Sequence, residues 1–88
     1  MEISASTPVV TGAGRGLGRH LVDVVLDRGV HKVYALARNP STVRQDARVV
    51  AVHFDLRDPD SIAEAARRAA DATLLINNAS TRLHAAGG

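Results

Sequence analysis

Short apolar runs alternate along the chain with stretches whose apolar residues recur every three or four positions. Runs of this length, rich in valine and leucine, are typical of buried strands, whereas the longer period is typical of helices. The pattern predicts strands at Thr7–Thr11, Lys32–Ala37, Arg48–Phe54 and Thr73–Asn77. Strands that alternate with helices favour a parallel sheet with crossover connections.

The first connecting helix is expected over about Arg15–Arg28, and Gly29 can end it. The second opens at Asp58-Pro59, because aspartate is a good N-cap and proline suits the first helical position, and it ends near Ala72. A short helix or turn is expected over Pro40–Gln45. The apolar positions of the first helix are Leu17, Leu21, Val24 and Val25. The second helix is expected to bury a stripe formed by Ile62, Ala65, Ala66, Ala69 and Ala70.

Right-handed crossovers would order the strands 3-2-1-4, which is the first half and one further strand of a doubly wound, Rossmann-type α/β fold. In that arrangement the fourth strand, with Leu74, Leu75 and Ile76, is expected to be buried on both faces. Residues 1–80 are therefore interpreted as the N-terminal portion of a Rossmann-type domain. Residues 81–88 are small and glycine-rich, and we expect a frayed tail.

Charge and composition disfavour several classes of protein. The 88 residues carry a formal net charge of +2, and the basic residues are spread along the chain, which disfavours a nucleic-acid-binding stripe. There is no cysteine and the histidines show no ligand spacing, so neither a disulfide nor a metal site is expected. No apolar stretch approaches the roughly 20 residues of a membrane span. We expect a cytoplasmic protein.

The stretch from Thr11 to Gly18 reads T-G-A-G-R-G-L-G and joins a predicted strand to a predicted helix. Glycines in such a turn let backbone N–H groups approach an anion, and the helix adds the positive end of its dipole. The spacing does not fit G-x-G-x-x-G, because Leu17 stands where the third glycine would be. A P-loop does not fit either, since no Gly-Lys-Ser/Thr follows. The pattern that fits is T-G-x-x-x-G-x-G.

With this loop the chain resembles the classical branch of the short-chain dehydrogenase/reductase family. Asp55-Leu56 after the third strand is similar to the Asp-aliphatic pair of that family, and Asn77-Asn78-Ala79 is similar to its N-N-A-G motif. The resemblance implies hydride transfer between a nicotinamide and a carbonyl or alcohol substrate. The cofactor-binding residues that follow are Gly12, Arg15, Gly16, Leu17, Gly18, Arg38, Asp55, Leu56, Asn78 and Ala79.

The nature of the cofactor depends on one position. An acidic residue about 20 residues beyond the loop would bind the ribose 2′-hydroxyl of NAD, but Arg38 stands there. A guanidinium can hold a 2′-phosphate through two hydrogen bonds, and Arg15 is a second candidate for the same group. We therefore expect NADP(H) to be preferred over NAD(H).

Within the resemblance, Asp55 and Leu56 contact the adenine ring, and Asn78 and Ala79 lie near the adenine ribose. Asn77 is instead expected to tie neighbouring strands together. Ser80 departs from the glycine that is usual in the family.

No catalytic residue is assigned. The family uses a serine and a Tyr-x-x-x-Lys pair on a later helix, whereas Tyr34, the one tyrosine here, lies in a predicted strand with Arg38 four residues on. We expect the cofactor-binding part of a longer reductase, inactive alone and without the helices through which family members oligomerise. One alternative is a small dinucleotide-binding module without chemistry. A methyltransferase-like module is a weaker alternative, because Val10 and Arg38 replace the acids expected around its loop.

Overall fold

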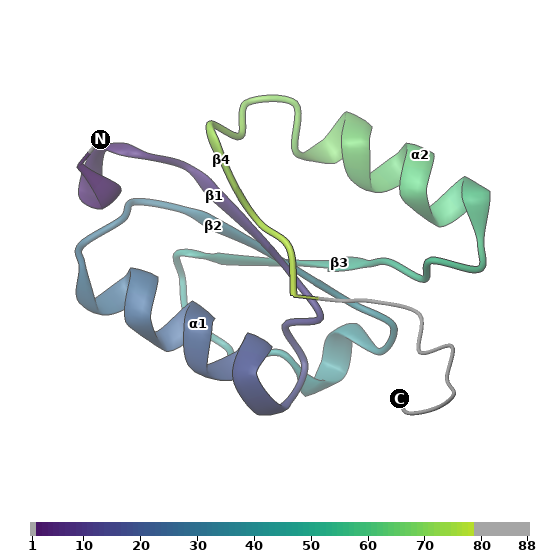
Figure 1. Cartoon of the computed structure of the whole chain (residues 1–88), viewed down its shortest axis with the longest axis horizontal. Helices are drawn as coiled ribbons and strands as arrows, with labels where there is room; N and C mark the ends of the chain where they lie inside the picture. The colour runs from purple at the N-terminus through teal and green to yellow at the C-terminus, as the bar shows by residue number, and fades with distance from the viewer. Residues whose placement is uncertain (1, 79–88) are drawn as a thin grey trace.

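The computed structural model describes residues 2–78, which form a four-stranded parallel sheet (Figure 1). The strands are β1 (Pro8–Thr11), β2 (Val33–Ala37), β3 (Val49–His53) and β4 (Leu74–Ile76). Their order, β3-β2-β1-β4, is the 3-2-1-4 order that the sequence predicts, and every neighbouring pair is parallel. The Rossmann-type α/β class is confirmed, whereas the tail expected at 81–88 lies outside the described residues.

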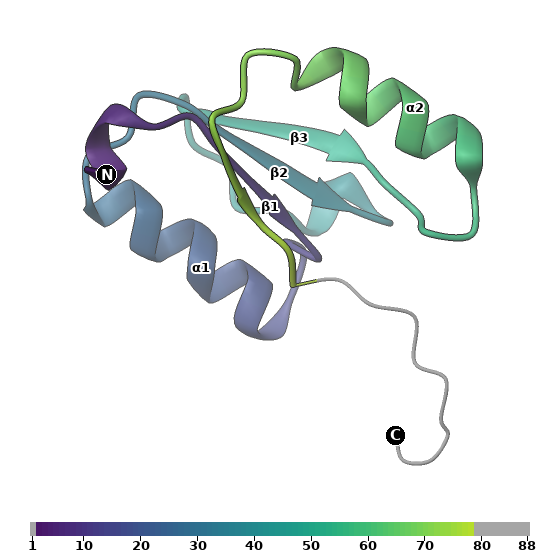
Figure 2. The same ribbon diagram turned by 45° about the horizontal axis from the view of Figure 1, so that its top comes forward.

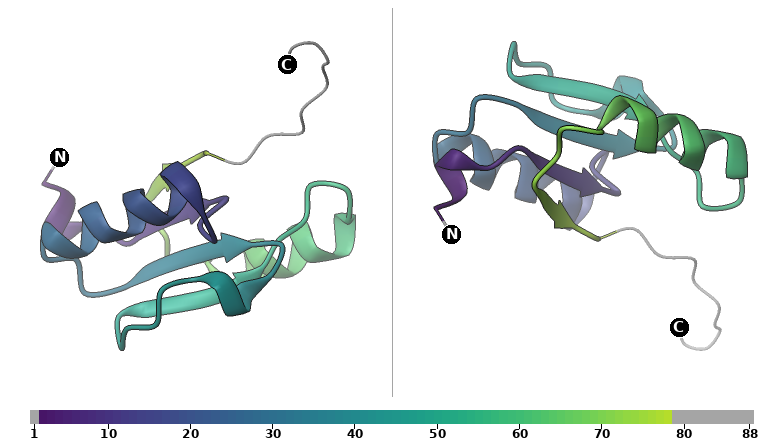
Figure 3. Two further views of the ribbon diagram at one scale, coloured as in Figure 1. Left: turned by 90° about the horizontal axis from the view of Figure 1, so that it is seen from below. Right: turned by 90° about the horizontal axis from the view of Figure 1, so that it is seen from above.

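Two helices cover opposite faces of this sheet (Figures 2 and 3). Helix α1 (Gly16–Asp27) follows β1, and helix α2 (Pro59–Arg68) joins β3 to β4. Short 3-10 turns, η1 (Ile3–Ala5) and η2 (Pro40–Thr42), complete the elements, and the sequence pattern did not predict η1. As expected, Asp58 caps α2, accepting hydrogen bonds from two backbone N–H groups of its first turn.

The helices enclose two separate apolar clusters. On the α1 face, valines and alanines of β1 and β2 pack against the helix, and Val10, Val22 and Val33 are wholly buried. On the α2 face, Tyr34 and Val52 pack with Ala65. Strand β2 is buried at all five residues because it lies between two strands and under both clusters.

The expected apolar stripe of α1 is displaced by about one position. Leu17 is 62% exposed, and the buried side chains are Val22, Val25 and Leu26. Residues one position apart differ by about 100° around a helix, so two neighbouring stripes satisfy the same three- and four-residue spacing. The sheet selects the stripe that contains Val22.

The predicted burial of α2 and β4 is wrong in larger part. Ile62, Ala66 and Ala70 are exposed, helix α2 ends at Arg68, and Leu75 is 64% exposed. The helix and the strand lie over different parts of the sheet. Helix α2 contacts β3, whereas β4 is at the opposite edge and pairs only with β1 among residues 2–78. A hollow of about 470 Å³ separates α2 from β4, with Val9, Leu36 and Leu75 in its wall.

Candidate functional site at the carboxyl ends of the strands

The sequence-predicted site residues meet at one edge of the sheet. The glycine loop follows β1, Arg38 follows β2, Asp55 follows β3 and Asn78 follows β4. Strands β2 and β3 lie on one side of β1, and β4 lies on its other side, so the strand order reverses at β1. Such a reversal of strand order is where open α/β sheets bind ligands.

The loop between β1 and α1 depends on glycine conformation at two positions. Gly12 has a φ of 65° and Gly16 a φ of 59°, a region that other residues enter at a cost of about 1–2 kcal/mol. Between them, the N–H of Ala13 donates to the carbonyl of Leu36 over 2.9 Å, which attaches the loop to β2. Arg15 is extended, with a φ of −165°, and immediately precedes α1.

Two glycines at the start of α1 have opposite steric surroundings. A Cβ atom added at Gly18 would lie 1.8 Å from the carbonyl oxygen of Gly12, so this position allows the helix to approach the loop backbone. A Cβ atom added at Gly16 would meet no heavy atom of the described residues within 4 Å. The loop is therefore closely packed beneath the helix and open at its first turn, where free N–H groups can bind an anion.

Hydrogen bonds join this loop to the end of β4. The Thr11 hydroxyl donates to Asn77 Oδ1 over 2.9 Å and accepts from the Asn78 N–H over 2.8 Å. Asn78 Nδ2 lies 3.4 Å from the Gly12 carbonyl oxygen. Asn77 thus joins neighbouring strands, as expected. Ala79 and Ser80 lie outside the described residues.

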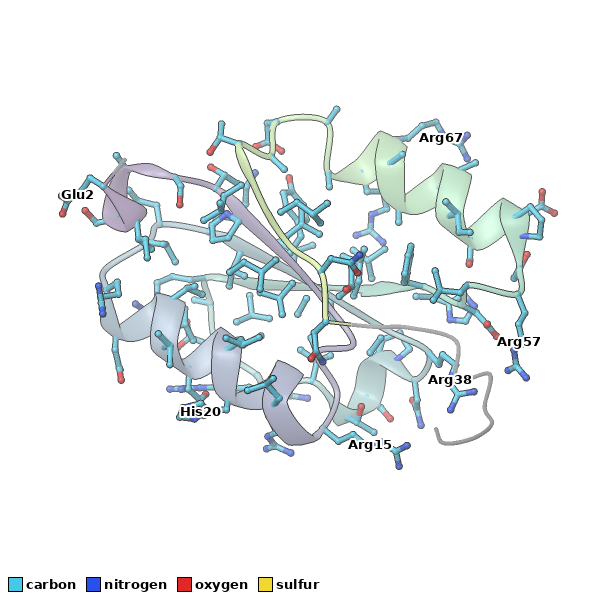
Figure 4. All side chains as sticks on the ribbon, viewed as in Figure 1. Glu2, Arg15, His20, Arg38, Arg57 and Arg67 are labelled. Carbon is cyan, nitrogen blue, oxygen red and sulfur yellow. The ribbon has the colours of Figure 1, made fainter. Side chains whose placement is uncertain are left out.

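Three guanidinium groups project at the same edge, from Arg15, Arg38 and Arg57 (Figure 4). Within residues 2–78, Arg15 and Arg38 form no ion pair. The backbone at Arg38 is fixed, because His53 Nδ1 lies 2.9 Å from its carbonyl oxygen and donates in the matching tautomer. This edge is therefore electropositive and suited to a phosphorylated ligand.

Asp55 is held in place more firmly than the sequence indicates. Its N–H donates to the Ser61 hydroxyl over 2.9 Å, and its carboxylate accepts from the backbone N–H, Nε and Nη2 of Arg57. The hydrogen bonds from Arg57 hold the pKa of Asp55 below its usual range, and the nearby charge of Arg38 acts in the same direction. Sequence reasoning missed Arg57, although an arginine two residues after the aspartate was the available signal.

Other kinds of site find no support among the described residues. Residues 2–78 contain no group of three or more histidine, cysteine or acidic side chains that could hold a metal ion. Within the same range, no helix combines the length and apolar character needed to cross a membrane. The loop and the strand ends around it are therefore the principal candidate site.

Comparison with known families assigns the chain. A family model described as NAD(P)H-binding matches residues 12–85, which begin at the first glycine of the loop. The chain belongs to this NAD(P)H-binding family. An uncharacterised oxidoreductase of Schizosaccharomyces pombe is 33% identical over 84 residues, which are 90% of this chain and 28% of that protein.

Two solved structures resemble this NAD(P)H-binding chain closely. One is a short-chain dehydrogenase from Burkholderia cenocepacia in complex with NADP, 46% identical, with a TM-score of 0.85 over 90% of this chain and 34% of that one. The other is a carbonyl reductase, described as putative and named Sniffer, from Caenorhabditis elegans, 29% identical, with a TM-score of 0.77 over 91% and 38% of the two chains. The chain spans about a third of the length of the proteins that it matches. Its resemblance to short-chain dehydrogenases is confirmed.

Proposed function

We propose that this chain binds NADP(H), in preference to NAD(H), as the cofactor-binding segment of a short-chain dehydrogenase/reductase. The observation that carries the proposal is the pair of guanidiniums on Arg15 and Arg38, which lie beside the glycine loop and form no ion pair within residues 2–78. NAD lacks the dianionic 2′-phosphate that such a pair would bind. The NADP complex of the Burkholderia structure supports the same cofactor.

The glycine loop suits the pyrophosphate of this cofactor. Residues 16–18 form the first turn of α1, and their N–H groups have no partner within the helix. At Gly16 no heavy atom of the described residues would block an anion at the helix N-terminus, and the close packing at Gly18 holds the loop backbone against the helix. Leu17 contributes through its backbone, because its side chain points away from the core and is 62% exposed.

The remaining contacts follow the strand ends. Arg38 and Arg15, which project at the same edge, bind the 2′-phosphate, while Asp55 and the backbone of Leu56 contact the adenine ring. Asn78 and Ala79 adjoin the adenine ribose. Supporting this arrangement, Asp55 has a side chain only 20% exposed and keeps a fixed backbone through Ser61.

The cofactor supplies or accepts a hydride, and in short-chain dehydrogenases/reductases the substrate that exchanges this hydride is a carbonyl or an alcohol. We assign no catalytic residue among residues 2–78. Tyr34 is unsuited to acid–base work at this site, because its hydroxyl donates to Asp71 just before β4, at the opposite end of the sheet. The proposed function of the described residues is therefore to bind and orient the cofactor.

Arg38→Asp tests the proposal directly. The replacement removes a charge-assisted contact and adds repulsion, so NADPH affinity should fall about 10- to 150-fold, whereas NADH affinity should hold or rise. Dissociation constants for both cofactors can be measured by isothermal titration calorimetry with the 88-residue chain.

The matched control is Arg67→Ala, since Arg67 is an exposed arginine on α2, away from this edge, and is paired with Glu64. It should change neither dissociation constant appreciably. An unchanged cofactor preference in Arg38→Asp would contradict the role of Arg38. Absence of binding by either cofactor to the unmodified chain would contradict the proposed function as a whole.

A further inference from the structure

The Asp55 carboxylate is unusual at this edge because most of its hydrogen-bonding capacity is already used. Oδ1 accepts two bonds from Arg57, from the backbone N–H at 2.9 Å and from Nε at 3.2 Å. Oδ2 accepts one, from Nη2 at 3.2 Å. A carboxylate offers about four acceptor positions, so the one that residues 2–78 leave unfilled is on Oδ2.

Arg57 also fixes the direction of that remaining position. Its two side-chain donors contact different oxygens of the carboxylate, which prevents rotation about the terminal bond of Asp55. The backbone beneath is fixed as well, because Ser61, itself only 6% exposed, bonds to both the N–H and the carbonyl of Asp55. The open lone pair of Oδ2 therefore has a defined position.

Arg57 itself remains largely in solvent. Its side chain is 69% exposed, whereas that of Asp55 is 20% exposed. Because the hydrogen bonds from Arg57 lower the pKa of Asp55, the Asp55 carboxylate stays ionised and accepts hydrogen bonds without donating any. The pair thus presents a single, oriented acceptor to a ligand at the edge of the sheet.

We infer that Arg57 is a positioning residue that makes this site selective for a 6-aminopurine over a 6-oxopurine. The inference rests on the proposed function, in which the adenine of the cofactor lies against Asp55. An exocyclic amino group donates to Oδ2, whereas the carbonyl oxygen of a hypoxanthine would face a carboxylate that cannot donate in return. By holding the open acceptor in place, Arg57 sharpens this difference without touching the base.

The test compares NADPH with its 6-oxo analogue, reduced nicotinamide hypoxanthine dinucleotide phosphate, by calorimetry. The measured quantity is the dissociation constant of the 6-oxo analogue divided by that of NADPH. Any change in attraction for the phosphates affects both constants equally and cancels in this ratio. Arg57→Ala should lower this ratio about three- to fivefold, because an exposed ion pair contributes up to about a fivefold effect. Arg57→Lys keeps the charge but not the two-point contact, so its ratio should be intermediate.

Two further variants separate the possible failures. Arg67→Ala removes an arginine of equal exposure from another ion pair and should leave the ratio unchanged. Asp55→Asn should lower the ratio strongly, because its amide can donate to a 6-oxo group.

A lowered ratio in Asp55→Asn with an unchanged ratio in Arg57→Ala would overturn the inference alone. Unchanged ratios in both would overturn the adenine contact and the inference with it, while NADPH binding itself stands. Tighter NADPH binding by Arg57→Ala would show that Arg57 competes with the base, which also overturns the inference. Failure of the unmodified chain to bind NADPH would instead count against the proposed function.

Discussion

At the scale of single residues, the site depends on where a side chain is missing as much as on where one is present. Gly18 permits contact with the Gly12 carbonyl that any Cβ atom would prevent. Gly16 has open space around it but a φ of 59°, so the reason for glycine there is conformational. The sequence shows both only as glycines in a motif, and the structure separates their roles.

Gly18→Ala should therefore destabilise the fold more than Gly16→Ala does. Because the clash at position 18 is with backbone, which cannot rotate away, we expect a loss of about 2 kcal/mol or more in the free energy of unfolding. The Gly16 variant should lose about 1 kcal/mol, the usual cost of a positive φ. Urea denaturation measures both values, and equal losses would contradict the steric role of Gly18.

At the scale of elements, β4 is the least self-sufficient strand and is held by side chains at both ends. It spans three residues and pairs with β1 alone among residues 2–78. Before it, the Thr7 N–H donates to the Thr73 hydroxyl and Tyr34 donates to Asp71. After it, the hydroxyl of Thr11, the last residue of β1, forms hydrogen bonds with the side chain of Asn77 and the N–H of Asn78.

Thr11→Val tests whether this join couples β4 to the loop. Valine has nearly the same shape, but it leaves the Asn78 N–H without that acceptor, so the free energy of unfolding should fall by about 1–3 kcal/mol. Amide hydrogen exchange at Asn78 should accelerate. Thr11→Ser keeps the hydroxyl and should retain slow exchange. Equal protection of Asn78 in the serine and valine variants would contradict the coupling.

The elements themselves were largely predictable, and their burial was less so. Strand order follows from the alternation of strand and helix and from right-handed crossovers, neither of which needs a distant contact. The exposure of Leu75 and of Ile62 could not be read from the pattern, because it depends on which strand lies beneath α2. Likewise, the approach of Arg57 to Asp55 is a matter of side-chain geometry that spacing alone leaves open.

At the scale of the whole molecule, basic groups differ in whether they have an acidic partner. The edge at the carboxyl ends carries Arg15 and Arg38, which form no ion pair within residues 2–78. Just before β2 and β3, by contrast, two basic groups have acidic partners: Lys32 bonds to Asp71, and its pKa rises to about 12 as a result. Arg48 bonds to Asp46 through its backbone and side chain.

These pairs make stability depend on acid pH. The hydrogen bonds from Arg48 lower the pKa of Asp46 from 3.8 to about 2. A carboxylate with a depressed folded-state pKa stabilises the fold above its unfolded pKa, and that contribution is lost as pH falls through the folded value. Unfolding free energies measured in urea should thus decline between about pH 4 and pH 2, and Asp46→Asn should decline less steeply. Identical slopes would contradict the role of this pair.

The central claim is that the edge at the carboxyl ends binds a dinucleotide bearing a 2′-phosphate. The most direct measurement is the ratio of the NADH and NADPH dissociation constants of the unmodified chain, obtained by calorimetry at one ionic strength. The account predicts that NADPH binds at least about tenfold more tightly, and that at 100 times its dissociation constant it stabilises the fold by about 2.7 kcal/mol. Equal affinities, or tighter binding of NADH, would contradict it.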